Sequence, residues 1–183
     1  MKSYLTSTIK QFEYYKSLGD KTINQLSFTE LKKEFLEDSN SISVIIKHMS
    51  GNMLSRWTHF LTEDGEKEWR KRDEEFIDSF STKEELIFAW EAGWSCLFNA
   101  ITPLNITDLE QIIYIRNQGH SVTEAINRQM MHYAYHVGQL VFLGKLIKGK
   151  QWQSLSISKG KSAEYNNTKF SKNKARRHFT EDL

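Results

Sequence analysis

Hydrophobic residues recur at helical spacing in four long stretches of the chain. In the first stretch the apolar positions run from Leu5 to Leu26, and the pair Gly19-Asp20 predicts an interruption within it. The second stretch follows a cluster of good N-cap residues at 38–41 and covers residues 42–61. Both patterns predict amphipathic α-helices with one apolar face.

The third and fourth stretches carry clearer start and stop signals. The third opens on Ser81-x-x-Glu84, which has the form of a capping box, and ends at Thr102-Pro103. The fourth opens on Ser121-x-x-Glu124, a second capping box, and continues to Lys148, with Gly149 as its C′ residue. Two more long helices are therefore predicted.

The segments between these helices differ in character. Residues 62–73 are strongly polar and predict a long connection over the surface, whereas residues 112–115 (Ile-Ile-Tyr-Ile) predict a small hairpin or an extended strap. We therefore expect an all-α protein in which residues 1–150 form a four-helix bundle, with a long crossover and a strap before the last helix.

Composition favours a single globular domain of this kind. The chain has 183 residues, of which 39% are hydrophobic and 26% charged, with one proline and one cysteine. Since no apolar run approaches 18 residues and no signal-type segment is found at the N-terminus, we expect no membrane partner. Cys96 stands alone, so no intrachain disulfide can form and a cytoplasmic location is expected.

The net charge of +2 conceals an uneven distribution. Residues 150–183 carry eight Lys or Arg and three Asp or Glu, so the other 149 residues have a net charge of −3. We expect residues 151–183 to be a basic, flexible extension. Because it lacks interleaved aromatic residues and a nucleic-acid motif, we do not expect a nucleic-acid partner.

The most informative chemistry lies in the fourth stretch, where His132 and His136 stand four residues apart. Positions i and i+4 share one face of a helix, and here that face also carries Leu140 and Leu143. Two inward imidazoles side by side are costly to bury, and a divalent ion removes that cost. From the pair alone, a metal site and a hydrogen-bonded structural pair remain open.

Two catalytic alternatives are disfavoured by neighbouring residues. A zincin protease needs a glutamate after the first histidine, and Tyr133 occupies that position. A di-iron bundle needs glutamate three residues before each histidine, where this chain has Gln129 and Tyr133.

A third histidine, His48, lies at the edge of the apolar face of the second stretch. Together with His132-x-x-x-His136-x-Gly-Gln139, it resembles the DinB/YfiT-like superfamily, and is most similar to a small bacterial branch of unassigned function. The likeness covers most of the chain and is carried by residues 40–42, 47–53, 55–57, 64–76, 90–94, 127–129, 132–139 and 158–164.

This resemblance implies a four-helix bundle, often dimeric, with one metal ion held by three histidines, which here are His48, His132 and His136. It also implies a small-molecule substrate and a homodimer. Three imidazoles leave coordination open for catalysis, and they suit zinc or nickel, with iron or manganese as alternatives.

Relatives in the superfamily include transferases and isomerases that use low-molecular-weight thiols. We therefore expect a bacillithiol-type S-transferase in which a metal-bound thiol or water is the reacting group. The alternatives are a metal-dependent hydrolase and a non-catalytic metal-binding or stress-response protein. A deep pocket with a free coordination site would favour an enzyme, and a sealed site would favour the non-catalytic protein.

Other residues receive secondary roles. Candidates for orienting the ligands or lining a substrate pocket are Asn52, Gln129, Tyr133, Gln139 and His120. Arg56 and Arg128 could bind an anionic substrate, but ion pairs are the favoured interpretation. The sequence offers no general base. His59 is expected on the surface, and Cys96 is expected in the core. The tryptophans at 57, 90 and 94 are expected either in the core or in the dimer interface.

Overall fold

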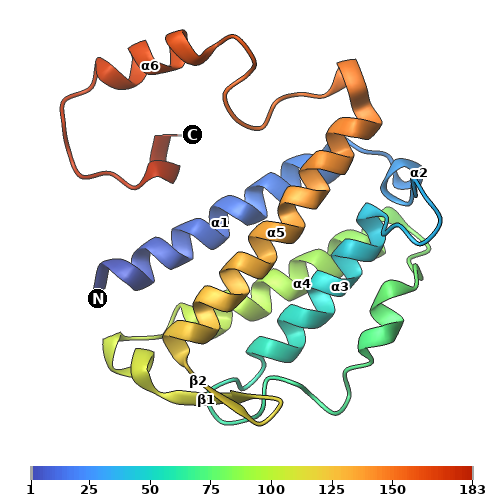
Figure 1. Ribbon diagram of the computed structural model, residues 1–183, viewed down its shortest axis with the longest axis vertical. Helices are drawn as coiled ribbons and strands as arrows, with labels where there is room; N and C mark the ends of the chain where they lie inside the picture. Colours follow the sequence, from blue (N-terminus) through green and yellow to red (C-terminus); the bar gives the residue numbers. More distant parts are fainter. Residues whose placement is uncertain (1, 183) are drawn as a thin grey trace.

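A computed structural model describes residues 2–182 and is mostly helical. Four long helices dominate it: α1 (Lys2–Asn24), α3 (Ile42–Trp57), α4 (Lys83–Ile101) and α5 (Val122–Lys148). Figure 1 shows α1 lying beside α5, with α3 and α4 side by side behind them. The four periodic stretches of the sequence therefore correspond to the four long helices.

Shorter elements connect these helices. They are α2 (Phe28–Leu31), the 3-10 helices η1 (Arg72–Phe76), η2 (Ile106–Glu110), η3 (Gly149–Gln151) and η4 (Phe179–Asp182), and helix α6 (Ser162–Phe170). Strands β1 (Ile112–Ile115) and β2 (Gln118–Ser121) form one antiparallel hairpin in which Ile112 pairs with Ser121. The expected strap is thus a hairpin, closed by Arg116 and Asn117 with φ of 55° and 58°, as in a type I′ turn.

The core is built from apolar faces that meet between the long helices. The rings of Phe12, Trp94 and Tyr133 join α1, α4 and α5, with centroids 5.9 to 6.4 Å apart. Trp57 and Trp90 are also buried, so all three tryptophans singled out in the sequence belong to the core. Cys96 is half-buried at its margin, beside Thr58.

Three predicted boundaries are wrong. Helix α1 continues through Gly19-Asp20, because Trp90 packs where a Cβ at position 19 would lie and donates to Asp20 at 2.7 Å. Helix α3 ends at Trp57 and not at residue 61, since His59 takes a left-handed conformation with φ of 47°. The third helix is capped by Thr82, which accepts from the Glu85 amide, one residue later than predicted.

The end of α5 agrees with the sequence pattern. Ser121 and Glu124 form the predicted capping box, and Gly149 takes the C-cap position with φ of 53°. Beyond it, the C-terminal segment contains α6 and returns to α1, where the His178 ring lies 3.0 Å from Ser7 Oγ. Within residues 2–182, no helix combines the length and apolar character needed to cross a membrane.

Candidate metal centre

Three histidines from two helices converge beside the core. His48 lies on α3, and His132 and His136 lie one turn apart on α5. The Nε2 atom of His132 is 3.4 Å from that of His48 and 3.0 Å from that of His136. The pattern at i and i+4 therefore places two imidazoles on one face of α5, and the packing of α3 adds the third.

The hydrogen bonds of the outer ring nitrogens define which nitrogens face inward. His48 Nδ1 lies 2.9 Å from Glu75 Oε2, and because a carboxylate only accepts, Nδ1 carries the proton. His136 Nδ1 lies 2.8 Å from Gln139 Oε1 and donates in the same way. With the Nδ1 proton in place, the neutral form of each ring presents an Nε2 lone pair to the centre of the cluster.

This arrangement fits a divalent cation. When the Nε2 atoms of His48 and His136 both carry lone pairs, only His132 Nε2 can donate a proton between the rings. One proton cannot satisfy both lone pairs fully, so at least one of them has no hydrogen-bond donor of its own. Nitrogens bound tetrahedrally to zinc at about 2.1 Å lie roughly 3.4 Å apart, close to the two separations found. Within residues 2–182, these three histidines are the group whose ligand atoms, all within 4.8 Å, are placed to hold an ion.

Burial keeps His132 and His136 in the protonation state that a metal needs. Burial, followed by the charges of His136 and His48, lowers the pKa of His132 to about 3. Burial also lowers the pKa of His136, although its hydrogen bond to Gln139 acts in the opposite direction. Both rings are therefore neutral ligands at physiological pH.

Glu75 lies against His48, a contact that the sequence interpretation missed. It lies on η1 and bridges His48 to Arg70, whose Nε and Nη2 atoms donate to it at 2.8 and 2.9 Å. Burial alone would raise the pKa of this carboxyl, but the bonds from His48 and Arg70 outweigh it and hold the pKa below its usual value. Gly51 makes room for it, because a Cβ there would collide with the carboxylate.

The polar connection at 62–73 is likewise more than a surface loop. Ser55 on α3 donates to the Gly65 carbonyl at 2.8 Å and accepts from the Lys67 amide at 3.2 Å. Asp64 accepts from the backbone amides of Arg116 and Asn117, which ties the connection to the hairpin. These contacts, some of them buried, hold Arg70 and Glu75 against the histidines.

The secondary candidates separate into different positions. Gln139 orients His136, while Asn52 and Gln129 line a cavity beside the histidines. Tyr133 is fully buried in the core, where it accepts from Trp57 Nε1 at 3.1 Å and donates to Asn52 at 3.0 Å. His120 lies on β2, where its Nε2 is 3.4 Å from an Arg128 nitrogen, and it is not part of the cavity wall.

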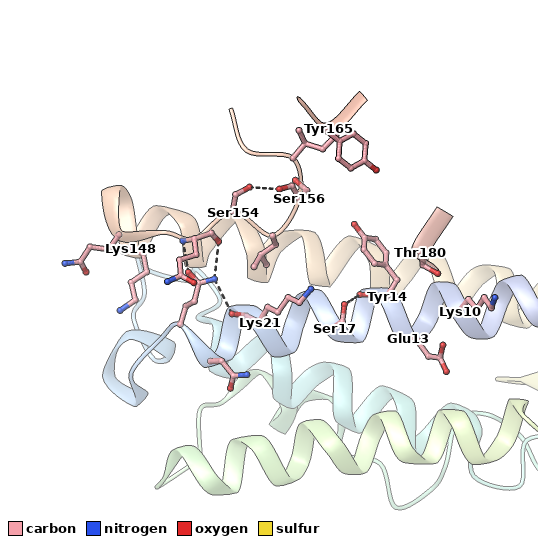
Figure 2. Close-up of a pocket in the computed structure, with 16 residues that line it drawn as sticks. Lys10, Glu13, Tyr14, Ser17, Lys21, Lys148, Ser154, Ser156, Tyr165 and Thr180 are labelled. Carbon is pink, nitrogen blue, oxygen red and sulfur yellow. Dashed lines mark hydrogen bonds between the residues drawn. The ribbon is translucent and has the colours of Figure 1, made fainter. Parts of the chain in front are cut away.

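The cavity beside the histidines has a volume of about 250 Å³ and is reached by the rings of His48 and His132. A larger cavity of about 1250 Å³ lies elsewhere, between α1 and the C-terminal segment (Figure 2). Its wall includes Lys10, Tyr14 and Tyr165 but none of the three histidines. The smaller cavity is therefore the one that can bring a ligand to the cluster.

The chain matches one family over most of its length. A family described as "Protein of unknown function (DUF1572)" matches residues 1–161. The chain belongs to this family. No curated protein and no solved structure matches it. The DUF1572 match covers all three histidines and every residue that lines the small cavity.

Replacing Tyr133 by phenylalanine should destabilise this DUF1572 protein without touching the histidines. The change leaves Trp57 Nε1 without an acceptor and Asn52 Oδ1 without a donor, so we expect a loss of about 2 kcal/mol in unfolding free energy. Urea denaturation measures it. The control Tyr135→Phe removes an exposed hydroxyl whose bond from Gln139 Nε2 is open to solvent, so the loss should stay below about 0.5 kcal/mol. Equal losses in both variants would contradict the buried network.

The stability of the metal-free protein should fall as the pH is lowered below 6.5. His132 has an ordinary pKa of 6.5 in the unfolded chain but about 3 when folded, so the unfolded state binds the extra proton across this window. The contribution of neutral His132 to the free energy of unfolding is complete above pH 6.5 and is lost progressively as the pH falls toward 3. Urea midpoints of chelator-treated protein at pH 7.5, 6.5 and 5.5 test this. His132→Gln should give a shallower dependence, and identical slopes would refute the assignment.

Proposed function

We propose that the protein is a metal-dependent enzyme with the DinB-type four-helix bundle, and that it transfers a low-molecular-weight thiol. The proposed ligands of its single divalent ion, zinc or nickel, are His48, His132 and His136. The convergence of their three Nε2 atoms is the observation that carries this proposal. When bound, the ion would supply positive charge that lowers the pKa of a thiol or water.

The surrounding residues support an enzyme over a purely structural site. Glu75 and Gln139 fix the rings of His48 and His136, and burial keeps His132 unprotonated. The cavity of about 250 Å³ gives a small molecule access to His48 and His132, which a sealed structural site would not provide. Thiol transfer itself rests on the resemblance to DinB-type transferases.

A conjugation assay tests the proposal. The full-length protein is loaded with zinc or nickel and mixed with bacillithiol and monochlorobimane, and the fluorescence of the conjugate is followed. We expect a metal-dependent rate that His132→Ala abolishes and His59→Ala retains, because His59 is exposed and outside the cluster. A rate no higher than the His132→Ala background would overturn the transferase.

We also propose a homodimer in the cytoplasm. The single cysteine supports a reducing compartment. A row of exposed apolar side chains on α5, at spacings of four, seven and four residues, supports self-association: Met131, Tyr135, Phe142 and Leu146. Light scattering should give twice the chain mass, and Phe142→Glu should shift it to one chain; a monomer in the unaltered protein would exclude the dimer.

A further inference from the structure

The small cavity beside the histidines is unusually rich in arginine. Within residues 2–182 nine residues line it, and five of them are arginines drawn from different parts of the fold. They come from α3, the 62–73 connection, η1, the hairpin turn and α5, in that order: Arg56, Arg70, Arg72, Arg116 and Arg128.

These arginines fall into two groups. The side chains of Arg56 and Arg70 are 6% and 2% exposed and are held by Glu66 and Glu75. The side chains of Arg72 and Arg116 are about half exposed, and Arg128 is exposed as well. The buried pair therefore forms part of the framework, while the other three guanidiniums are accessible to a ligand.

Carboxylates do not balance this charge. One oxygen of Glu66 is shared by Arg56, Arg70 and Arg116 at 3.0, 3.3 and 3.2 Å. Even with Glu75 and the nearby Asp64 included, five guanidiniums face three carboxylates. The exposed pair between Arg72 and Asp73, at 3.8 Å, is screened by solvent and changes little.

Three lining residues also keep unused hydrogen-bonding capacity. Arg128 makes no ion pair with any described residue, and its Nη1 atom lies 3.4 Å from His120 Nε2. Among the residues that the structure describes, Arg56 Nε and Gln129 Oε1 are buried without a protein partner. Unpaired buried groups are uncommon in folded proteins, so the free N–H of Arg56 Nε indicates a ligand that accepts a hydrogen bond. Gln129 Oε1 is itself an acceptor and needs a donor, such as a hydroxyl or N–H group, on another part of that ligand.

We infer that this cavity is an anion subsite, which binds a carboxylate or phosphate group of a small substrate and so places the rest of that molecule beside His48 and His132. Planar guanidinium groups bind both oxyanions through paired N–H donors. An excess of two positive charges suits a dianion. The inference rests on the proposed function for its catalytic meaning, but the subsite itself consists of arginines and does not need the metal.

Calorimetric titration of the full-length protein tests the subsite. Inorganic phosphate and succinate serve as probes at low salt, with protein as purified and after chelator treatment. We expect saturable binding of at least one probe in both preparations, weakened about tenfold or more in Arg128→Gln. The tighter probe assigns the head group as phosphate or carboxylate. Arg177→Gln, which alters an exposed arginine in the C-terminal segment, should bind as the unaltered protein does.

The outcomes separate this inference from the proposed function. No saturable binding of either probe would overturn it and reduce the arginines to a structural ion network. Binding that survives unchanged in Arg128→Gln, or that requires the metal, would overturn it as well. Arginine-dependent binding in chelated protein, combined with no thiol conjugation, would retain the anion subsite while refuting the transferase.

Discussion

His132→Ala should abolish metal binding while leaving the fold intact. The Nε2 atom of His132 lies within 3.4 Å of the Nε2 atoms of both other rings, and its loss leaves His48 and His136 as the remaining ligands. We expect elemental analysis to give about one zinc or nickel per chain in the unaltered protein and less than roughly 0.1 in the variant. Far-UV circular dichroism should be unchanged, because the ring is only partly buried.

A second readout tests the same site through stability. An ion that binds only the folded state raises the free energy of unfolding by about 4 kcal/mol when its concentration is a thousand times the dissociation constant. Added metal should therefore raise the urea midpoint of the unaltered protein and of His59→Ala, but not of His132→Ala. His48→Ala should behave like His132→Ala. Full metal content in either of these variants would refute the three-histidine site.

The long helices and the histidine pair could be predicted because both depend on local sequence. Apolar spacing defines α1, α3, α4 and α5, and the i, i+4 rule places His132 and His136 on one face. The capping box at Ser121 was predicted for the same reason, since its two partners are three residues apart. The break at Gly19 was not real, because a tryptophan 71 residues later in the chain fills the space beside that glycine.

The surroundings of the histidines could not be read from local patterns. Glu75 is 27 residues from His48, and residues 62–76 contain several other acids that the sequence does not distinguish from it. Gly51, one turn beyond His48 on α3, was the available signal, because a glycine on an apolar helix face indicates a close neighbour. Tyr133 follows His132, but consecutive helix positions point about 100° apart, so its hydroxyl lies in the core and contacts the cavity only through its bond to Asn52.

Glu75→Ala should be the most destabilising single change at the site. The variant leaves the buried guanidinium of Arg70 with only Glu66, at 3.3 Å, and removes the acceptor of His48 Nδ1. Removing one member of a buried ion pair costs about 3–5 kcal/mol, and the remaining contact to Glu66 places this case near 3 kcal/mol. Urea denaturation of metal-free protein at pH 7 gives the value.

The neighbouring residue provides the matched control for this prediction. Glu74 lies on the same 3-10 helix, is exposed, and pairs only with exposed Lys71, so Glu74→Ala should cost less than about 0.5 kcal/mol. Glu75→Gln keeps an acceptor for His48 but removes the negative charge that makes this ring a better ligand. We expect it to retain most of the stability and to weaken metal binding about 10- to 100-fold. If Glu75→Gln bound metal as tightly as the unaltered protein, Glu75 would serve only to bury Arg70 and would have no part in the metal centre.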